Sequence, residues 1–168
     1  IMKNTTQRVV MASLLAALTC VATMLIRIPS PFKGYINLGD CVVLLCGFLL
    51  SPMYGFLAAG IGSALADLFS GYVVYAPVTF AIKGLMALVA YFGFKLLSKR
   101  FKALPSQIIS GVVAELLMVA GYFVFEGFLY GFVPSAVNIL PNAVQGAVGL
   151  VLGILLVRVF EKSKIKLN

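Results

Sequence analysis

Ionisable side chains lie within long apolar segments of this sequence, and they are the residues that could do chemistry. The chain of 168 residues has no histidine, which removes the commonest general base and metal ligand. Two of its carboxylates, Glu115 and Glu126, could form an acid–base pair. They are eleven residues apart in the sequence, which is roughly 16 Å along a helix. The two groups are too far apart to act on one bond, so we expect no enzyme activity.

Cofactor and metal motifs are also missing from the sequence. Cys20, Cys41 and Cys46 follow no spacing typical of a zinc site or a disulfide framework, and we interpret them as small packing residues. The phosphate-binding loop G-x-x-x-x-G-K followed by Ser or Thr does not occur. We therefore expect this chain to hold no metal and no cofactor.

The elements that position the ionisable residues are membrane helices. Hydrophobic residues make up 62% of the chain and charged residues 11%, whereas soluble domains are about half apolar and a quarter charged. Apolar runs recur, most of them near the ~20 residues that cross a bilayer as a helix. We predict an all-α integral membrane protein, with residues 1–168 forming a single transmembrane domain of six helices. The expected helices cover about 6–28, 38–50, 53–70, 77–97, 105–130 and 135–160.

Lysine and arginine residues predict the orientation of these helices. Ten of the thirteen basic residues precede the first helix, join the fourth to the fifth or follow the sixth, whereas the opposite side keeps only Arg27 and Lys33. Because cytoplasmic loops carry the excess of positive charge, we expect both termini in the cytoplasm and a multi-pass protein of a bacterial-type plasma membrane. This rule and attraction to anionic lipid explain the net charge of +8, so we expect no nucleic-acid partner.

Three of the predicted helices carry a polar stripe in their outer halves. The stripes are Thr79 and Lys83 with Tyr75 just outside, then Glu115, Tyr122 and Glu126, and finally Asn138, Asn142, Gln145 and Gly149. A charged side chain that faces lipid costs about 2.5–3.5 kcal/mol or more, so these groups must face one another or a wet cavity. Mainly apolar walls with a few polar groups and tyrosines are typical of a small-molecule site. The alternative is simple helix–helix hydrogen bonding, which averages about 0.6 kcal/mol per bond.

Two further acids have structural interpretations. Asp67 lies at the end of the third helix and Lys83 lies within the fourth. Either the two side chains form an ion pair, or Lys83 turns toward a ligand. Asp40 lies at the start of the second helix, where a carboxylate is a good cap.

On the first helix Ala12, Ser13, Ala16 and Ala17 make two overlapping pairs of small residues four apart. Such pairs let helices approach closely, either within the bundle or against another membrane subunit.

Several stretches resemble one family along nearly the whole chain. They are "INLGD", "GSALADLFSGYVVYAPVTFAIKGLMA", "AELLMVAGYFVFE" and "PNAVQGAVG". Together they resemble the substrate-binding S component of energy-coupling factor (ECF) vitamin transporters. Within that family the pattern is most similar to the hydroxymethylpyrimidine or pyridoxine branch, with the riboflavin branch next.

The resemblance implies a six-helix protein that captures a vitamin from outside with high affinity. It implies a transmembrane T component and two cytoplasmic ATPases as partners, which use the ATP. By the same resemblance Ala12 and Ala16, with Ser13 and Ala17 beside them, would dock the T component. The loop 28–37, which contains Tyr35, would cover the site, and the outer halves of the last three helices would build it.

These arguments give one main hypothesis and two alternatives. In the main hypothesis Tyr122, with Tyr75 or Tyr35, stacks on a small heterocycle, and Glu115, Asn142 and Gln145 hydrogen-bond to it. Lys83, Asn138 and Glu126 complete the expected site. The first alternative is riboflavin or another vitamin as substrate. The second is a membrane assembly subunit that binds no ligand.

Overall fold

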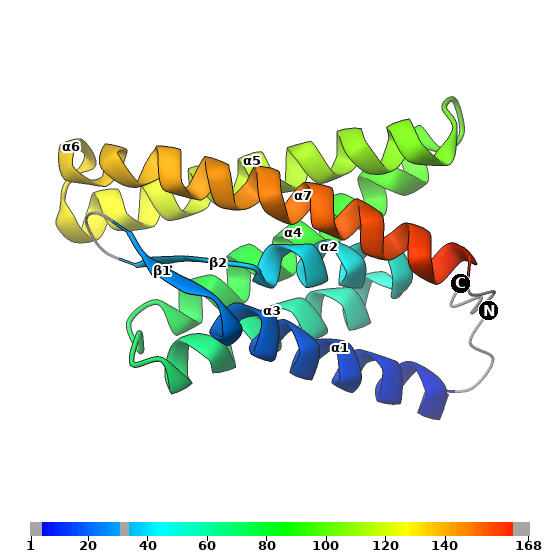
Figure 1. Ribbon diagram of the computed structural model, residues 1–168, viewed down its shortest axis with the longest axis horizontal. Helices are drawn as coiled ribbons and strands as arrows, with labels where there is room; N and C mark the ends of the chain where they lie inside the picture. Colours follow the sequence, from blue (N-terminus) through cyan, green and yellow to red (C-terminus); the bar gives the residue numbers. More distant parts are fainter. Residues whose placement is uncertain (1–4, 31–33, 163–168) are drawn as a thin grey trace.

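Six helices form an elongated bundle in the computed structural model, which describes residues 5–30 and 34–162 (Figure 1). They are α1 (Thr5–Leu25), α2 (Gly39–Leu49), α3 (Pro52–Phe69), α4 (Ala76–Leu97), α5 (Ala103–Tyr130) and α7 (Ile139–Lys162). A short helix α6 (Phe132–Ser135) and a 3-10 turn (Ala136–Asn138) join α5 to α7. All of these helices except α2 belong to segments long and apolar enough to span a membrane, which confirms the predicted fold class.

A small antiparallel hairpin follows α1, where the sequence predicted helix as far as residue 28. Its strands are β1 (Arg27–Pro29) and β2 (Tyr35–Asn37), with Ile28 opposite Ile36. A residue that precedes proline is driven from the helical to the extended region. Because Pro29 follows Ile28, the helix ends early and the chain turns back as a strand. Residues 31–33, in the predicted covering loop, lie outside the described part.

Helix α2 lies at the centre of the bundle and is only half the length of a span. Its eleven residues are all buried, and it contacts α1, α3, α4, α5 and α7. A helix that is apolar all round is a buried helix, and eleven residues cover about 16 Å of the roughly 30 Å hydrocarbon core. The hairpin occupies the remaining outer part (Figure 1). The start of α2 therefore lies inside the bundle, and not at its outer surface as predicted.

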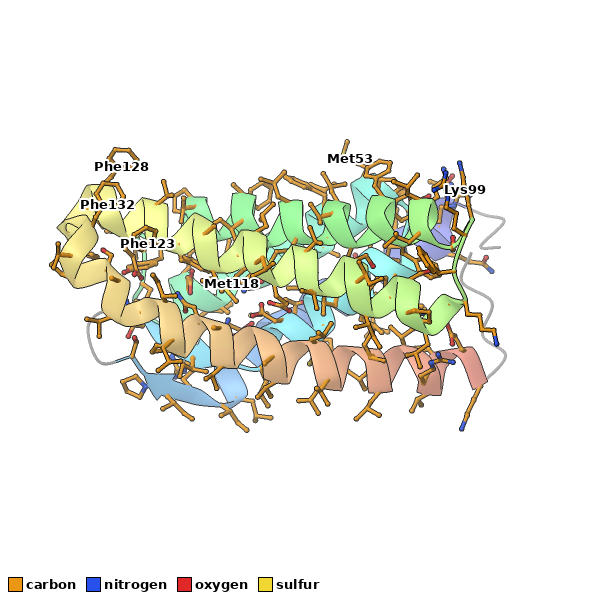
Figure 2. All side chains as sticks on the ribbon, turned by 90° about the horizontal axis from the view of Figure 1, so that it is seen from above. Met53, Lys99, Met118, Phe123, Phe128 and Phe132 are labelled. Carbon is orange, nitrogen blue, oxygen red and sulfur yellow. The ribbon has the colours of Figure 1, made fainter. Side chains whose placement is uncertain are left out.

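Positive charge gathers at one end of the bundle. Lys99 lies at the end where α1 begins and α7 finishes, and Phe123, Phe128 and Phe132 lie at the other (Figure 2). Arg100 and Lys102 belong to the turn that joins α4 to α5, and Lys95 lies in the last turn of α4. This end faces the cytoplasm by the positive-inside rule, so the hairpin faces outward. The basic residues at positions 3, 33, 164 and 166 lie outside the described part.

Helices α1 and α3 pack closely where Ala16, one of the small residues identified on the first helix, meets Gly62. A Cβ atom added at Gly62 of α3 would lie 2.3 Å from the carbonyl oxygen of Ala16. Ala12 and Ala16 are half-buried against the core, whereas Ser13 and Ala17 are exposed. Of the four residues predicted to dock another subunit, Ala12 and Ala16 therefore pack toward the bundle, and Ser13 and Ala17 face outward.

Replacing Gly62 with alanine is expected to destabilise the protein by about 1–3 kcal/mol, because overpacking forces backbone shifts. The melting temperature of the purified protein in detergent would show this. Ala17→Ser is the matched control, because it adds one atom to the exposed side of α1 and should leave the melting temperature unchanged. A Gly62→Ala variant as stable as the parent would show that α1 and α3 do not meet at this position.

Candidate functional site

A cavity of about 40 Å³ lies between the hairpin and the outer halves of the helices. Its lining comes from the second strand and the residue before it, the α3–α4 turn and helices α3, α4, α5 and α7: Gly34, Tyr35, Asn37, Asp67, Tyr72, Tyr75, Thr79, Tyr122, Glu126, Asn142 and Gln145. One water needs about 10–15 Å³ of such space. In this closed form the cavity therefore holds a few waters, and a vitamin must displace part of the lining.

A buried ion pair forms the floor beneath this cavity, and it differs from the predicted pair. The Lys83 ammonium bonds to the Asp40 carboxylate, and both side chains are almost completely buried. Lys83 contacts Asp40 and not Asp67 because α2 begins inside the bundle, level with the first turns of α4. Asp40 is therefore not a helix cap. The N-terminus of α2 instead uses Asn37, whose Oδ1 accepts a hydrogen bond from the Gly39 N–H at 2.8 Å.

Gln145 connects the ion pair to the hairpin. Its Nε2 donates to Asp40 Oδ2 at 2.6 Å, and its Oε1 accepts from the Asn37 backbone N–H at 2.9 Å and from Asn37 Nδ2 at 3.3 Å. Both polar ends of this buried amide are thus satisfied. Gln145 fixes the end of β2 against α7 and completes the hydrogen bonding of Asp40.

Asp67 binds the hairpin. The Tyr35 hydroxyl donates to Asp67 Oδ1 at 2.6 Å. Burial, together with the neighbouring Asp67 carboxylate, raises the pKa of Tyr35, so its hydroxyl stays protonated and donates at physiological pH. Asp67 lines the cavity on the outer side, which the predicted pairing with Lys83 did not foresee.

Glu126 lies at the centre of a second outer network. Its carboxylate accepts from the Tyr75 hydroxyl at 3.2 Å and from Asn138 Nδ2 at 2.9 Å, and the Ser30 hydroxyl bonds to Asn138 Oδ1. Burial is the main cause that raises the pKa of Tyr75, with smaller contributions from Tyr130 and Glu126. The hairpin is therefore held by three polar ties, to α3, to α7 and to the turn before α7.

Aromatic rings form one wall of the cavity. The ring centroids of Tyr35 and Tyr72 are 4.9 Å apart, and those of Tyr72 and Tyr75 are 6.0 Å apart. Tyr122 also lines the cavity, and its hydroxyl pairs with Thr79 Oγ1 at 3.0 Å. The Lys83 Nζ lies 5.5 Å from the centroid of the Tyr122 ring. Tyr122 thus separates the cavity from the ion pair beneath it.

Glu115 does not line the cavity, although the sequence suggested it as a ligand acceptor. It is buried next to Gly146 and Gly149, whose missing side chains leave room for it. Neither carboxyl oxygen has a hydrogen-bond partner among the described residues. Lys83 and Asn138 are likewise behind the lining rather than part of it. The polar stripes do converge, but part of each stripe is used in contacts between helices.

Asn142 is the lining amide most available to a ligand. It faces the cavity, and its side chain forms no hydrogen bond with residues 5–30 and 34–162. Sequence reasoning did not identify Gly34, Asn37 or Tyr72 as lining residues. The only signal for any of them was the stretch "INLGD", which contains Asn37. Helical periodicity cannot place residues that lie in a hairpin or a turn.

Comparison with known proteins gives three findings. A family model described as "ECF-type riboflavin transporter, S component" matches residues 3–162. A Pyrococcus woesei protein described as "Uncharacterized protein in gap 3'region" is 35% identical over 134 residues, which are 79% of this chain and 87% of the relative. A solved structure described as "Structure and mechanism of the S component of a bacterial ECF transporter" has a TM-score of 0.72 with 23% identity, covering 95% of this chain and 98% of that chain. At that identity the last likeness shows the fold alone.

Proposed function

The chain belongs to the family of ECF-type riboflavin transporter S components, and on that premise we propose that its substrate is riboflavin. It is a multi-pass subunit of the plasma membrane that serves vitamin transport, and it is not an enzyme. The sequence favoured hydroxymethylpyrimidine or pyridoxine and kept riboflavin as an alternative. The family match supports the alternative better.

The observation that carries the proposal is the cavity beneath the hairpin. Four tyrosines offer faces for a planar ring, and Asn142 and Gln145 offer amides for ring nitrogens and carbonyls. The cavity is too small for a flavin in its closed form. Binding therefore requires the hairpin to move outward, which breaks the ties of Tyr35 to Asp67 and of Asn37 to Gln145. Groups of the vitamin then take over these hydrogen bonds.

We further propose that the chain works with a transmembrane T component and two cytoplasmic ATPases that supply the energy. Ser13 and Ala17 support this, because they leave a flat, exposed strip on α1 against which another helix fits closely. Ala12 and Ala16 contribute from the half-buried side of the same helix.

A thermal-shift titration tests the proposed substrate. A ligand at 100 times its dissociation constant stabilises the folded state by about 2.7 kcal/mol, so riboflavin should raise the melting temperature of the purified protein by several degrees. Hydroxymethylpyrimidine, pyridoxine and thiamine are measured beside it. Asn142→Ala should reduce the riboflavin shift without changing the melting temperature of the free protein, whereas Ser98→Ala at the cytoplasmic end should change neither.

The result for each vitamin decides a different point. A shift with pyridoxine or hydroxymethylpyrimidine but not with riboflavin would return the substrate to the branch that the sequence favoured. No shift with any of the four would contradict vitamin binding and support an assembly subunit without a ligand.

A further inference from the structure

The side-chain amide of Gln145 has one defined orientation in the cavity lining. Its Nε2 donates to Asp40 Oδ2 at 2.6 Å, and its Oε1 accepts from the Asn37 backbone N–H at 2.9 Å. An ionised carboxylate only accepts hydrogen bonds, and a backbone N–H only donates them. Turning the amide round would place an acceptor against the carboxylate and a donor against the N–H. Both neighbours of Gln145 thus require the same orientation.

The ion pair beneath the cavity fixes this orientation from below. One carboxylate oxygen of Asp40 bonds to the Lys83 ammonium, and the other accepts from Gln145. All three side chains are almost completely buried, which shields these bonds from water. A carboxylate paired with an ammonium has no donor of its own, so Gln145 can only donate to it. Asp40 and Lys83 therefore orient the amide, although neither residue lines the cavity.

This orientation places a carbonyl oxygen, and not an NH2 group, on the cavity side of Gln145. In the closed form the oxygen accepts from the backbone and the side chain of Asn37. Outward movement of the hairpin removes these donors and leaves the oxygen buried. A buried acceptor without a partner is costly, so the ligand must bring a donor to this point.

Asn142 can contact the same edge of a ligand. It lies three residues before Gln145 on α7, and side chains at this spacing are neighbours on a helix surface. Its amide lines the cavity and forms no hydrogen bond with residues 5–30 and 34–162, so it can turn its NH2 group toward a carbonyl. A ring edge with an N–H beside a carbonyl would donate to Gln145 Oε1 and accept from Asn142.

From this arrangement we infer that Gln145 recognises a ring N–H of the vitamin, and that Asp40 and Lys83 are positioning residues that set the direction of this hydrogen bond. The inference rests on the proposed vitamin-binding function. The ring system of riboflavin has one N–H, that of the imide at its position 3, which lies between two carbonyl groups. This edge supplies the donor for Gln145 and a carbonyl for Asn142.

Two analogues of riboflavin test which group is recognised, by titration of the unmodified full chain. 3-Methylriboflavin has a methyl group in place of the imide hydrogen and leaves the Gln145 oxygen without a donor, so it should bind roughly 10- to 100-fold more weakly than riboflavin. 5-Deazariboflavin keeps the imide and changes the central ring, so its affinity should stay close to that of riboflavin. Equal affinities for riboflavin and 3-methylriboflavin would overturn the inference and leave riboflavin binding intact.

Substitutions at the ion pair separate the loss of the donor from the bulk of the methyl group. In Asp40→Asn the new amide gives its oxygen to Lys83 and its NH2 group to Gln145, so the Gln145 amide turns round. Its NH2 group then meets the imide N–H, and the ratio between the affinities for riboflavin and 3-methylriboflavin should fall toward one. In Lys83→Met/Asp40→Asn the oxygen at position 40 again accepts from Gln145, so the ratio should recover. Glu161→Gln, the same change of acid to amide at the exposed cytoplasmic end, is the matched control and should leave the ratio unchanged.

The possible results distinguish the inference from the proposed substrate. A ratio that keeps its full value in Asp40→Asn would show that bulk alone excludes the methyl group, and a ratio lost equally in the single and the double variant would show that the ion pair has only a structural role. Either result overturns the positioning role of Asp40 and Lys83. The comparison of analogues on the unmodified protein needs no variant to fold. If riboflavin itself does not bind, the proposed substrate is wrong and the inference is overturned with it.

Discussion

Replacing Lys83 with methionine is expected to lower the free energy of unfolding by about 3–5 kcal/mol, because it leaves a buried carboxylate without its partner. Lys83 and Asp40 are both almost completely buried and bond to each other. Only Gln145 would remain as a hydrogen-bond donor to Asp40 among the described residues, and a single neutral amide does not compensate a charge at this depth. Chemical or thermal unfolding in detergent micelles would measure the loss.

A second substitution identifies the cause of that loss. Asp40→Asn removes the orphaned charge and keeps an oxygen that accepts from Gln145, so the double variant Lys83→Met/Asp40→Asn should recover most of the lost stability. Lys95→Met is the matched control, because Lys95 is exposed at the cytoplasmic end and should have little effect. If the double variant were as unstable as Lys83→Met alone, packing of the lysine stem, and not charge, would dominate.

The bundle could be predicted from the sequence because hydrophobic length and basic residues report directly on the membrane. Each apolar run corresponds to a helix of the structure, and the basic residues gather at the end where α1 begins and α7 finishes. Glu115, Tyr122 and Glu126 indeed lie on the inner side of α5. Helical periodicity gives the face on which a residue lies, and for this chain it did so correctly.

The depth at which α2 begins in the membrane, and the ion-pair partner of Lys83, could not be predicted in the same way. The pairing of Lys83 with Asp40 depends on where α2 begins along the membrane normal, and that depends on a hairpin of two three-residue strands. A single sequence does not show how far such a hairpin reaches into a bundle. Asp67 therefore seemed the natural partner of Lys83 because it is closer in sequence than Asp40, whereas it binds Tyr35 of the hairpin.

Truncating Tyr122 to alanine is expected to have the largest effect of any single lining residue on vitamin affinity. Its ring forms the wall between the cavity and the Lys83–Asp40 pair, so it offers a face to the ligand and keeps the cavity apart from a buried charge. Removing an aromatic anchor of this kind costs about 2–4 kcal/mol, which corresponds to a roughly 30- to 1,000-fold weaker affinity. Titration of each purified variant with riboflavin would measure the change.

Two further substitutions show which part of Tyr122 is responsible. Tyr122→Phe keeps the ring and loses only the contact of the hydroxyl with Thr79, so its affinity should stay within about tenfold of the parent, as expected for one neutral hydrogen bond. Tyr91→Ala is the matched control, because Tyr91 lies on the cytoplasmic half of α4, next to Lys95, and does not line the cavity. If Tyr122→Phe lost as much affinity as Tyr122→Ala, the hydroxyl and not the ring would bind the vitamin. Unchanged affinity in Tyr122→Ala would move the ligand away from this wall altogether, toward the tyrosines of the hairpin and of the α3–α4 turn.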